Sequence, residues 1–141
     1  MERKEFVLAA LAPAKGHVLR PVQVQKLFFL IDREIPNEVD GPRFDFQPYD
    51  YGPFDSEVYS ELRALAADGL VDILQDWNWS SYRLTVEGQE KAEKFFKTLS
   101  KKARDYIATV TEFVRGLSFT ELVSAIYKAY PEMRANSAFR E

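Results

Sequence analysis

The chain has 141 residues, which is enough for one domain with one hydrophobic core. Hydrophobic residues make up 46% and charged residues 29%, as in ordinary soluble globular proteins, and the absence of cysteine excludes disulfides, thiol chemistry and cysteine-based zinc sites. The net charge of −3 is uneven: it amounts to +1 over residues 1–43, −8 over residues 44–90 and +4 over residues 91–141. The acidic middle of the chain would therefore attract basic partners, and the basic C-terminal third would attract acidic ones.

The start of the chain carries no pattern of a secreted or membrane protein. Met1 is followed directly by charged residues, and Pro13 and Lys15 interrupt the first apolar stretch. A signal peptide or a membrane span needs a longer uninterrupted apolar run, of about 20 residues for a span. We therefore expect a cytoplasmic protein without membrane contact.

The first third of the chain predicts two helices and a short strand. Residues 3–11 form a first amphipathic helix, which Pro13 ends. A proline suits the first position of a second helix over residues 21–35, where apolar residues recur at helical spacing. The alternation in residues 44–46 is typical of a strand, and Pro48 restricts that strand to a sheet edge.

A third helix is predicted after a turn that contains Gly52 and Pro53. Asp55 or Ser56 can cap the start of this helix, and Gly69 ends it as a left-handed cap. The buried stripe of the helix is predicted to consist of Val58, Leu62 and Leu65.

A β-hairpin is predicted directly after the third helix. Its strands cover residues 70–74 and 82–84, and residues 75–80 join them. Thr85 then starts the next helix. A helix followed at once by a hairpin is typical of a winged-helix core.

The last third of the chain predicts helices only. Apolar positions keep a helical period across residues 87–116, which form either one long helix or two helices that meet near Ser100. Residues 118–121 are a capping box that opens a final helix, and Pro131 ends it.

These elements together predict a mainly α (α+β) protein with a single winged-helix-like domain over residues 1–141. The winged core, with its small antiparallel β-hairpin, is predicted over residues 1–90. Residues 91–141 are expected to be a helical extension packed on that core.

The chain offers little for catalysis. His17 is the only histidine, and neither a nucleophile motif nor an orienting carboxylate accompanies it, so we interpret it as an exposed loop residue. The sequence contains no phosphate-binding glycine motif and no calcium-loop spacing. We therefore predict that the protein is not an enzyme and binds no metal and no cofactor.

The third helix is a poor candidate for reading DNA, although winged helices often do so. Its edge carries Glu57, Glu61 and Asp68, which would repel the phosphates that supply most of the affinity for a duplex. The same acidic edge suits a basic protein partner.

A basic stripe in the last third is the alternative nucleic-acid surface. Its members follow one another at i, i+3, i+7 and i+10, as one face of a continuous helix would place them. The stripe is either a phosphate-contacting face or a solvated helix face. It consists of Lys94, Lys97, Lys101 and Arg104.

Aromatic residues gather around the middle of the chain. A structural turn is predicted from Tyr51, Gly52, Pro53 and Phe54, because a Gly-Pro turn flanked by aromatic rings usually packs against a core. Two interpretations stay open for Trp77 and Trp79: they cover the hairpin, or they form a patch that binds a protein partner.

Four motifs stand out along the chain: V-Q-K-L-F-F-L-I-D at residues 24–32, Y-G-P-F-D-S-E-V-Y at residues 51–59, G-L-V at residues 69–71 and A-I-Y-K-A-Y-P-E-M-R-A-N-S at residues 125–137. Together they resemble the SocA-like (Panacea) group and the related phage-associated and YwgA-like winged-helix proteins. The resemblance covers roughly residues 20–137.

The resemblance implies a small prokaryotic or phage protein, often one that neutralises a toxin by binding it directly. We therefore expect a non-enzymatic protein-binding module, antitoxin-like or associated with phage defence, and not separable by sequence from a noncatalytic domain of a larger defence system. The residues expected to contact a basic partner, such as a toxin or defence component, are Glu57, Glu61, Asp68, Trp77 and Trp79.

The alternative hypothesis is a DNA-binding transcriptional regulator that acts as a homodimer. In that case the helices across residues 87–117 supply the dimer interface. The phosphate contacts would come from the basic stripe, and the affinity for DNA would fall steeply with salt.

Overall fold

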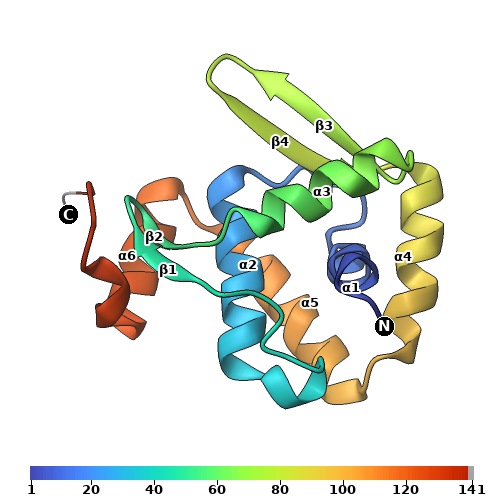
Figure 1. The fold of residues 1–141 in the computed structure, drawn as a ribbon, viewed down its shortest axis with the longest axis horizontal. Coiled ribbons are helices and arrows are strands. Elements are labelled where there is room, and N and C mark those ends of the chain that lie inside the picture. The colour runs from blue at the N-terminus through green and yellow to red at the C-terminus, as the bar shows by residue number, and fades with distance from the viewer. Residues whose placement is uncertain (140–141) are drawn as a thin grey trace.

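The structure, a computed structural model, describes residues 1–139 apart from the side chain of Asp76. It is mainly α, with two antiparallel two-stranded sheets and three short 3₁₀ turns within those residues (Figure 1). The helices are α1 (Arg3–Ala10), α2 (Pro21–Glu34), α3 (Glu57–Ala67), α4 (Val86–Thr98), α5 (Lys101–Gly116) and α6 (Phe119–Ala129). The strands are β1 (Gln47–Tyr49), β2 (Gly52–Phe54), β3 (Val71–Asp76) and β4 (Trp79–Leu84).

Helix α1 lies at the centre of the helical body, where Figure 1 shows it end-on between α2, α3 and α4. Its residues 6–10 are all buried, so every side of this short helix faces protein. The Phe6 ring meets Phe28 of α2 edge-on at 5.7 Å. The sequence predicted burial on one stripe only, because a pattern within eight residues does not reveal that a helix is surrounded.

Helix α2 begins at Pro21 as predicted, and it too is buried over nearly its whole length. The buried residues of α2 include three polar ones, namely Gln25, Lys26 and Asp32. Since buried polar groups need partners, the contacts of these three side chains show how the neighbouring segments are held.

Helix α3 confirms its predicted stripe, since its buried residues are Val58, Leu62 and Leu65. Gly69 follows the helix with a φ of +77°, which confirms the left-handed end. Ser56 occupies the capping position, but its side chain makes no capping bond. The backbone N–H of Glu57 instead donates to Asp55 Oδ1 at 2.9 Å.

The strand predicted at residues 44–46 is wrong, and a hairpin that was not predicted follows it. Residues 44–46 are irregular, because the N–H of Phe44 donates to the buried Asp32 carboxylate at 2.8 Å instead of to a neighbouring strand. Strand β1 begins at Gln47, which pairs with Phe54 of β2.

The predicted structural turn of Tyr51, Gly52, Pro53 and Phe54 is also corrected. The chain turns at Asp50 and Tyr51, and Gly52–Phe54 is strand β2. Gly52 has a φ of +107°, a conformation that favours glycine, so it admits the bend at the start of the strand.

The second hairpin is present but longer than predicted. Strand β3 extends to Asp76 and β4 begins at Trp79, which leaves a two-residue turn at Trp77 and Asn78. The hairpin projects away from the helices in Figure 1. Leu19, between α1 and α2, adds to its edge by exchanging two backbone hydrogen bonds with Tyr82, at 2.8 and 2.9 Å.

The last third contains separate helices, which resolves the question of one helix or two. Ser100 lies outside both α4 and α5, and its Oγ accepts the N–H of Ala103 at 3.1 Å. Thr85 caps α4, and the capping box of Ser118 and Glu121 opens α6, both as predicted. Residues from α1 through α6 contribute to one continuous cluster of buried apolar side chains.

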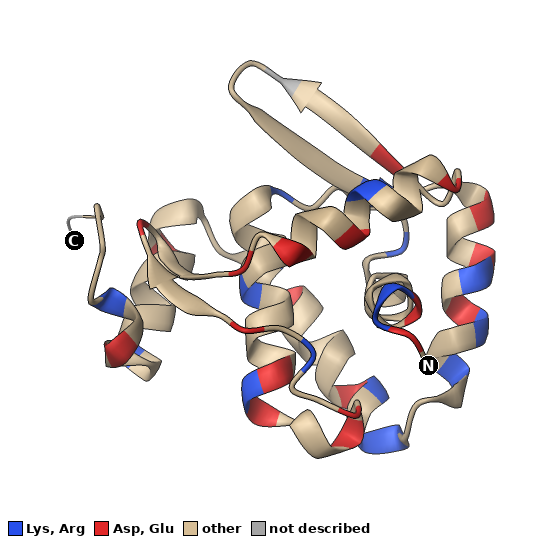
Figure 2. Cartoon of the chain, in the orientation of Figure 1, with Lys and Arg blue, Asp and Glu red and all other residues tan. Residues whose placement is uncertain are grey.

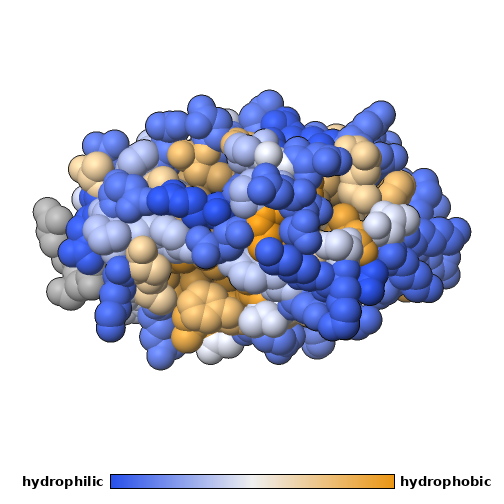
Figure 3. Space-filling model, turned by 90° about the horizontal axis from the view of Figure 1, so that it is seen from below, coloured by the Kyte–Doolittle hydropathy of each residue, from blue (hydrophilic) through white to orange (hydrophobic). Residues whose placement is uncertain are grey.

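The face of the molecule seen from below is predominantly polar. Hydrophilic residues there surround several limited apolar areas (Figure 3). Apolar areas of this kind are usual on folded domains. Within residues 1–139, every helix falls short of the length and apolar character that crossing a membrane requires.

Candidate functional site

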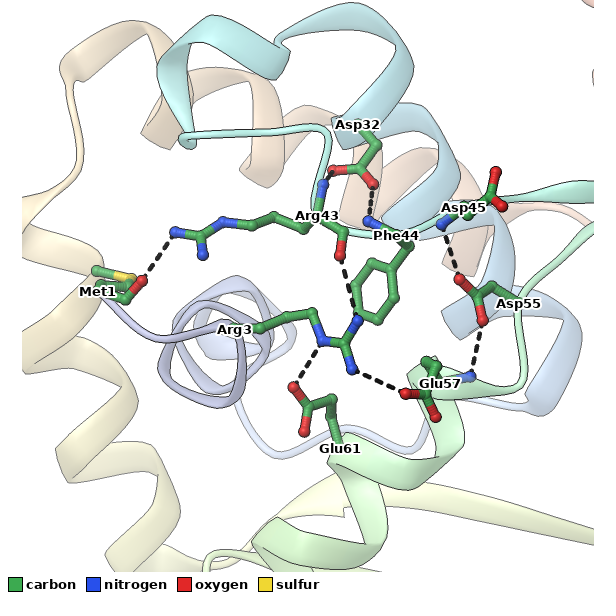
Figure 4. Close-up of polar contacts among 9 residues, drawn as sticks. All are labelled: Met1, Arg3, Asp32, Arg43, Phe44, Asp45, Asp55, Glu57 and Glu61. Atoms are coloured by element: carbon green, nitrogen blue, oxygen red, sulfur yellow. Dashed lines mark hydrogen bonds and ion pairs between the residues drawn. The ribbon is translucent and has the colours of Figure 1, made fainter.

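The acidic edge of α3 forms ion pairs with α1 (Figure 4). The Arg3 guanidinium donates to Glu61 at 2.8 Å and to Glu57 at 3.2 Å, and the Glu61 bond is the main reason why the pKa of Arg3 is raised. Lys4 pairs with Asp68 at 3.0 Å. Two cations of α1 thus offset the three carboxylates that the sequence assigned to a basic partner.

The loop before β1 joins this network and explains why that region is irregular. Both oxygens of the Asp32 carboxylate accept backbone N–H groups, from Arg43 at 2.9 Å and from Phe44 at 2.8 Å. Burial raises the pKa of Asp32, and these two bonds oppose the rise. The Arg43 side chain reaches the carbonyl oxygen of Met1 at 2.9 Å (Figure 4). The role of this cluster is structural, because it fixes the loop to α1 and α2.

The predicted basic stripe does not form one face. Lys94 and Lys97 lie on α4 while Lys101 and Arg104 lie on α5, and the break between the helices interrupts the spacing. Lys101 pairs with Asp105 at 2.6 Å, and Arg104 donates to the carbonyl oxygen of Leu99 at 2.8 Å. Figure 2 shows acidic residues beside basic ones along α4.

The two tryptophans have different surroundings. Trp77 is at the tip of the hairpin and is 96% exposed, with a φ of +44°. Trp79 is 44% exposed and forms part of the wall of a groove. The structure therefore separates the patch that the sequence predicted, and it brings only Trp79 together with other aromatic residues.

The aromatic groove is a hollow of about 510 Å³ between α2, the first hairpin, β4 and the start of α6. Sites for small ligands and side-chain anchors commonly have this size, an apolar lining and a few polar groups. Its aromatic wall is formed by Tyr49, Tyr51, Phe54, Tyr59, Trp79 and Phe119.

The rings of the groove contact one another across the first hairpin, α3 and α6. Tyr49 stacks on Phe54 at 5.0 Å, and Phe54 meets the edge of Tyr59 at 5.8 Å. On the other side, Tyr51 meets Phe119 of α6 at 5.2 Å. Because five of the six rings are each supported by another, most of the wall is held in shape before anything binds.

The floor of the groove contains two polar side chains of α2. Gln25 exchanges hydrogen bonds with the backbone of Asp55, donating and accepting at 3.0 Å, which holds the end of β2 against α2. Lys26 is 2% exposed, and its Nζ donates to the carbonyl oxygen of Tyr51 at 2.6 Å. Burial lowers the pKa of Lys26 to about 7.

Gly52 makes room for this lysine. A Cβ atom at position 52 would lie 3.2 Å from Lys26 Nζ and 3.3 Å from its Cε. The glycine that bends the chain into β2 therefore also lets the ammonium group approach the backbone of the hairpin.

Comparison with models of protein families, with curated proteins and with solved structures finds no match. The site must therefore be interpreted from its own geometry. Among the side chains of residues 1–139 that the structure describes, His, Asp and Glu form no group of three that could hold a metal ion. His17 is exposed, in agreement with its interpretation as a loop residue.

Sequence reasoning missed Lys26 and Phe119 as groove residues. A signal for Lys26 was present, since Phe29 and Leu30 lie three and four positions later and share its side of the helix. A lysine on an apolar helix face is either buried or extends its end to solvent. Only the hairpin that folds over α2 decides between these outcomes.

Proposed function

We propose that this protein is a noncatalytic binding module of the winged-helix class, and that it binds a protein partner by enclosing an apolar segment of it in the aromatic groove. The observation that carries this proposal is the groove itself. Tyr49, Tyr51, Trp79 and Phe119 are all partly exposed around one hollow. Exposed aromatic residues gathered at a preformed hollow are typical of the hot spots of protein interfaces.

The order of the elements supports the winged-helix assignment. Helix α1, the extended segment at Leu19, helices α2 and α3, and strands β3 and β4 follow one another, and Leu19 pairs with β4. We interpret this order as a helical core with a wing, into which β1 and β2 are inserted between α2 and α3. Helices α4, α5 and α6 extend it.

The electrostatics favour a protein partner over a duplex. Helix α3 would be the recognition helix of a winged helix, yet Arg63 is its only basic residue. Its carboxylates are paired with cations of α1, and carboxylates do not attract the phosphates of DNA. The resemblance to antitoxin-like proteins supports a toxin or a defence component as the partner, and the lack of cysteine fits a cytoplasmic setting.

A displayed library of random peptides tests the groove while the partner is unidentified. We expect the wild-type protein to enrich peptides with aromatic or large aliphatic residues. Trp79→Ala should weaken the binding of the enriched peptides about 30-fold, as loss of an aromatic anchor worth about 2 kcal/mol would. The measurement is a fluorescence anisotropy titration with each labelled peptide.

Trp77→Ala is the matched control for that titration. Its ring is more exposed than that of Trp79 and lies outside the groove, so peptide affinity and the thermal midpoint should both stay close to the wild-type values. If no peptide is enriched, or if both substitutions weaken binding equally, the groove is not the binding site.

A titration with duplex DNA at low and moderate salt tests the alternative regulator. We expect no tight binding at either salt concentration, since the basic residues of α4 lie beside acidic residues (Figure 2), and Lys101 of α5 is paired with Asp105. Light scattering on the same samples gives the oligomeric state. Tight binding by a dimer that weakens steeply with salt would replace the present proposal with a DNA-binding regulator.

A further inference from the structure

Lys26 is a buried cation with fewer acceptors than its ammonium group can use. An ammonium group has three N–H donors, and the carbonyl oxygen of Tyr51 accepts one of them. Among the ion pairs formed by the described residues, none includes Lys26. A buried charge without a counterion is costly, so a fold retains one where something compensates it.

The other charged and titratable groups of the groove do not supply that compensation. Asp50 in the turn of the first hairpin lines the groove but forms no ion pair with the lysine. The exposed Arg20, at the start of α2, adds a second positive charge at the rim. Tyr49, Tyr51 and Tyr59 contribute phenol groups, none of which forms an ion pair with the lysine. The groove thus combines an apolar aromatic wall with a cationic floor.

We propose that the partner segment enclosed by the aromatic groove carries a carboxylate, and that this carboxylate forms an ion pair with Lys26 Nζ on the groove floor. This inference rests on the proposed function, and it names the chemistry of the ligand: an apolar or aromatic peptide residue next to a carboxylate. The ligand would supply the acceptor that the two remaining donors of Lys26 lack. Hydrogen bonds between ionised groups are about twice as strong as neutral ones, and more so away from water.

The pairing makes binding depend on pH with a definite sign. In the free protein the pKa of Lys26 is about 7, so the lysine is charged below that pH and increasingly neutral above it. A carboxylate ligand is ionised throughout this range and pairs only with the charged form. Affinity should therefore be constant below about pH 6.5 and fall up to tenfold for each pH unit above 7.5.

The test uses acetyl-Phe-Phe with a free carboxyl terminus as the probe, and its C-terminal amide as the uncharged match. Calorimetric titration at pH 6.5 should show that the wild-type protein binds the acid at least tenfold more tightly than the amide. The preference should shrink as the pH is raised from 7 to 9. Lys26→Met should bind both probes equally at every pH, and the exposed Lys94→Met, outside the groove, should behave as the wild type.

Each result of this titration either supports or overturns the proposed ion pair between Lys26 and a ligand carboxylate. Equal binding of acid and amide by the wild-type protein, or no binding of either probe, overturns the carboxylate pairing. A preference that survives in Lys26→Met also overturns it, since another cation would then hold the carboxylate. Enrichment of peptides by the wild-type protein, lost in Trp79→Ala, would still support the groove as a binding site. The two proposals therefore fail separately, and the pH profile of the wild type tests the pairing even if Lys26→Met does not fold.

Discussion

Gly88→Ala is expected to destabilise the protein by about 3 kcal/mol or more. Gly88 lies in the first turn of α4, where the helix packs against the backbone of Leu70, the residue before β3. A Cβ atom there would overlap the carbonyl oxygen of Leu70 and lie 2.8 Å from its carbonyl carbon. Because these are backbone atoms, no side-chain rotation can relieve the overlap.

Neighbouring hydrogen bonds keep the two segments from separating. Thr85 donates its N–H to the carbonyl oxygen of Leu70 at 3.1 Å, and its hydroxyl donates to that of Gly69 at 2.8 Å. The same hydroxyl accepts the N–H of Gly88 at 2.9 Å. Moving α4 away would break these contacts and disturb its packing on α1, so urea unfolding should show a large fall in the midpoint.

Gly116→Ala is the matched control for this substitution. Gly116 ends α5, and a Cβ atom there would meet nothing within 4 Å. Alanine favours helix more than glycine does, so this variant should equal the wild type or exceed it by up to about 1 kcal/mol. Wild-type stability in Gly88→Ala would mean that α4 does not pack on β3 as the structure has it.

Lys26→Met is expected to remove a large pH dependence of stability. The pKa of Lys26 is about 7 in the folded protein and 10.5 in a solvated lysine. Each pKa unit corresponds to about 1.4 kcal/mol, so below pH 7 burial of the charged lysine costs on the order of 5 kcal/mol. The unfolded chain binds the extra proton between these two pKa values, so wild-type stability should rise as the pH is raised from 7 to 10.

Urea unfolding at a series of pH values measures this effect. Relative to the wild type, Lys26→Met should be most stabilised at pH 6 to 7, and its advantage should decline toward pH 10. Lys94→Met, which changes an exposed lysine of α4, should follow the wild-type curve. Parallel curves for the wild type and Lys26→Met would show that Lys26 is hydrated or paired in the folded protein.

The helices of this protein were largely predictable because their signals are local. A proline at the start of α2, Thr85 before α4 and the capping box before α6 each act within one helical turn. The stripe of α3 follows from a period that any buried helix face requires. Only the helix boundary at Ser100 could not be predicted. A serine within an uninterrupted apolar period can either cap a new helix or lie inside a continuous one.

The strands and the site were less predictable because they depend on distant residues. The alternation of residues 44–46 suggested a strand, but Asp32 of α2 takes the backbone N–H groups that a strand would use. The acids of α3 suggested a docking face, but Arg3 of the N-terminal helix α1 forms ion pairs with two of them. Periodicity in one segment contains no information about which cation or carboxylate a second segment will supply.

The sequence by itself determined the mainly helical class, the ends of most helices and the absence of thiol chemistry, because each follows from residue type or from spacing within a few turns. The tertiary structure alone decided that α1 is surrounded, that Trp79 and Phe119 share a wall, and that Lys26 is buried beneath it. The physical reason is that burial and pairing are properties of packed neighbours. The first hairpin shows this directly, since a lysine that could have extended to water is covered by a segment 25 residues further along the chain.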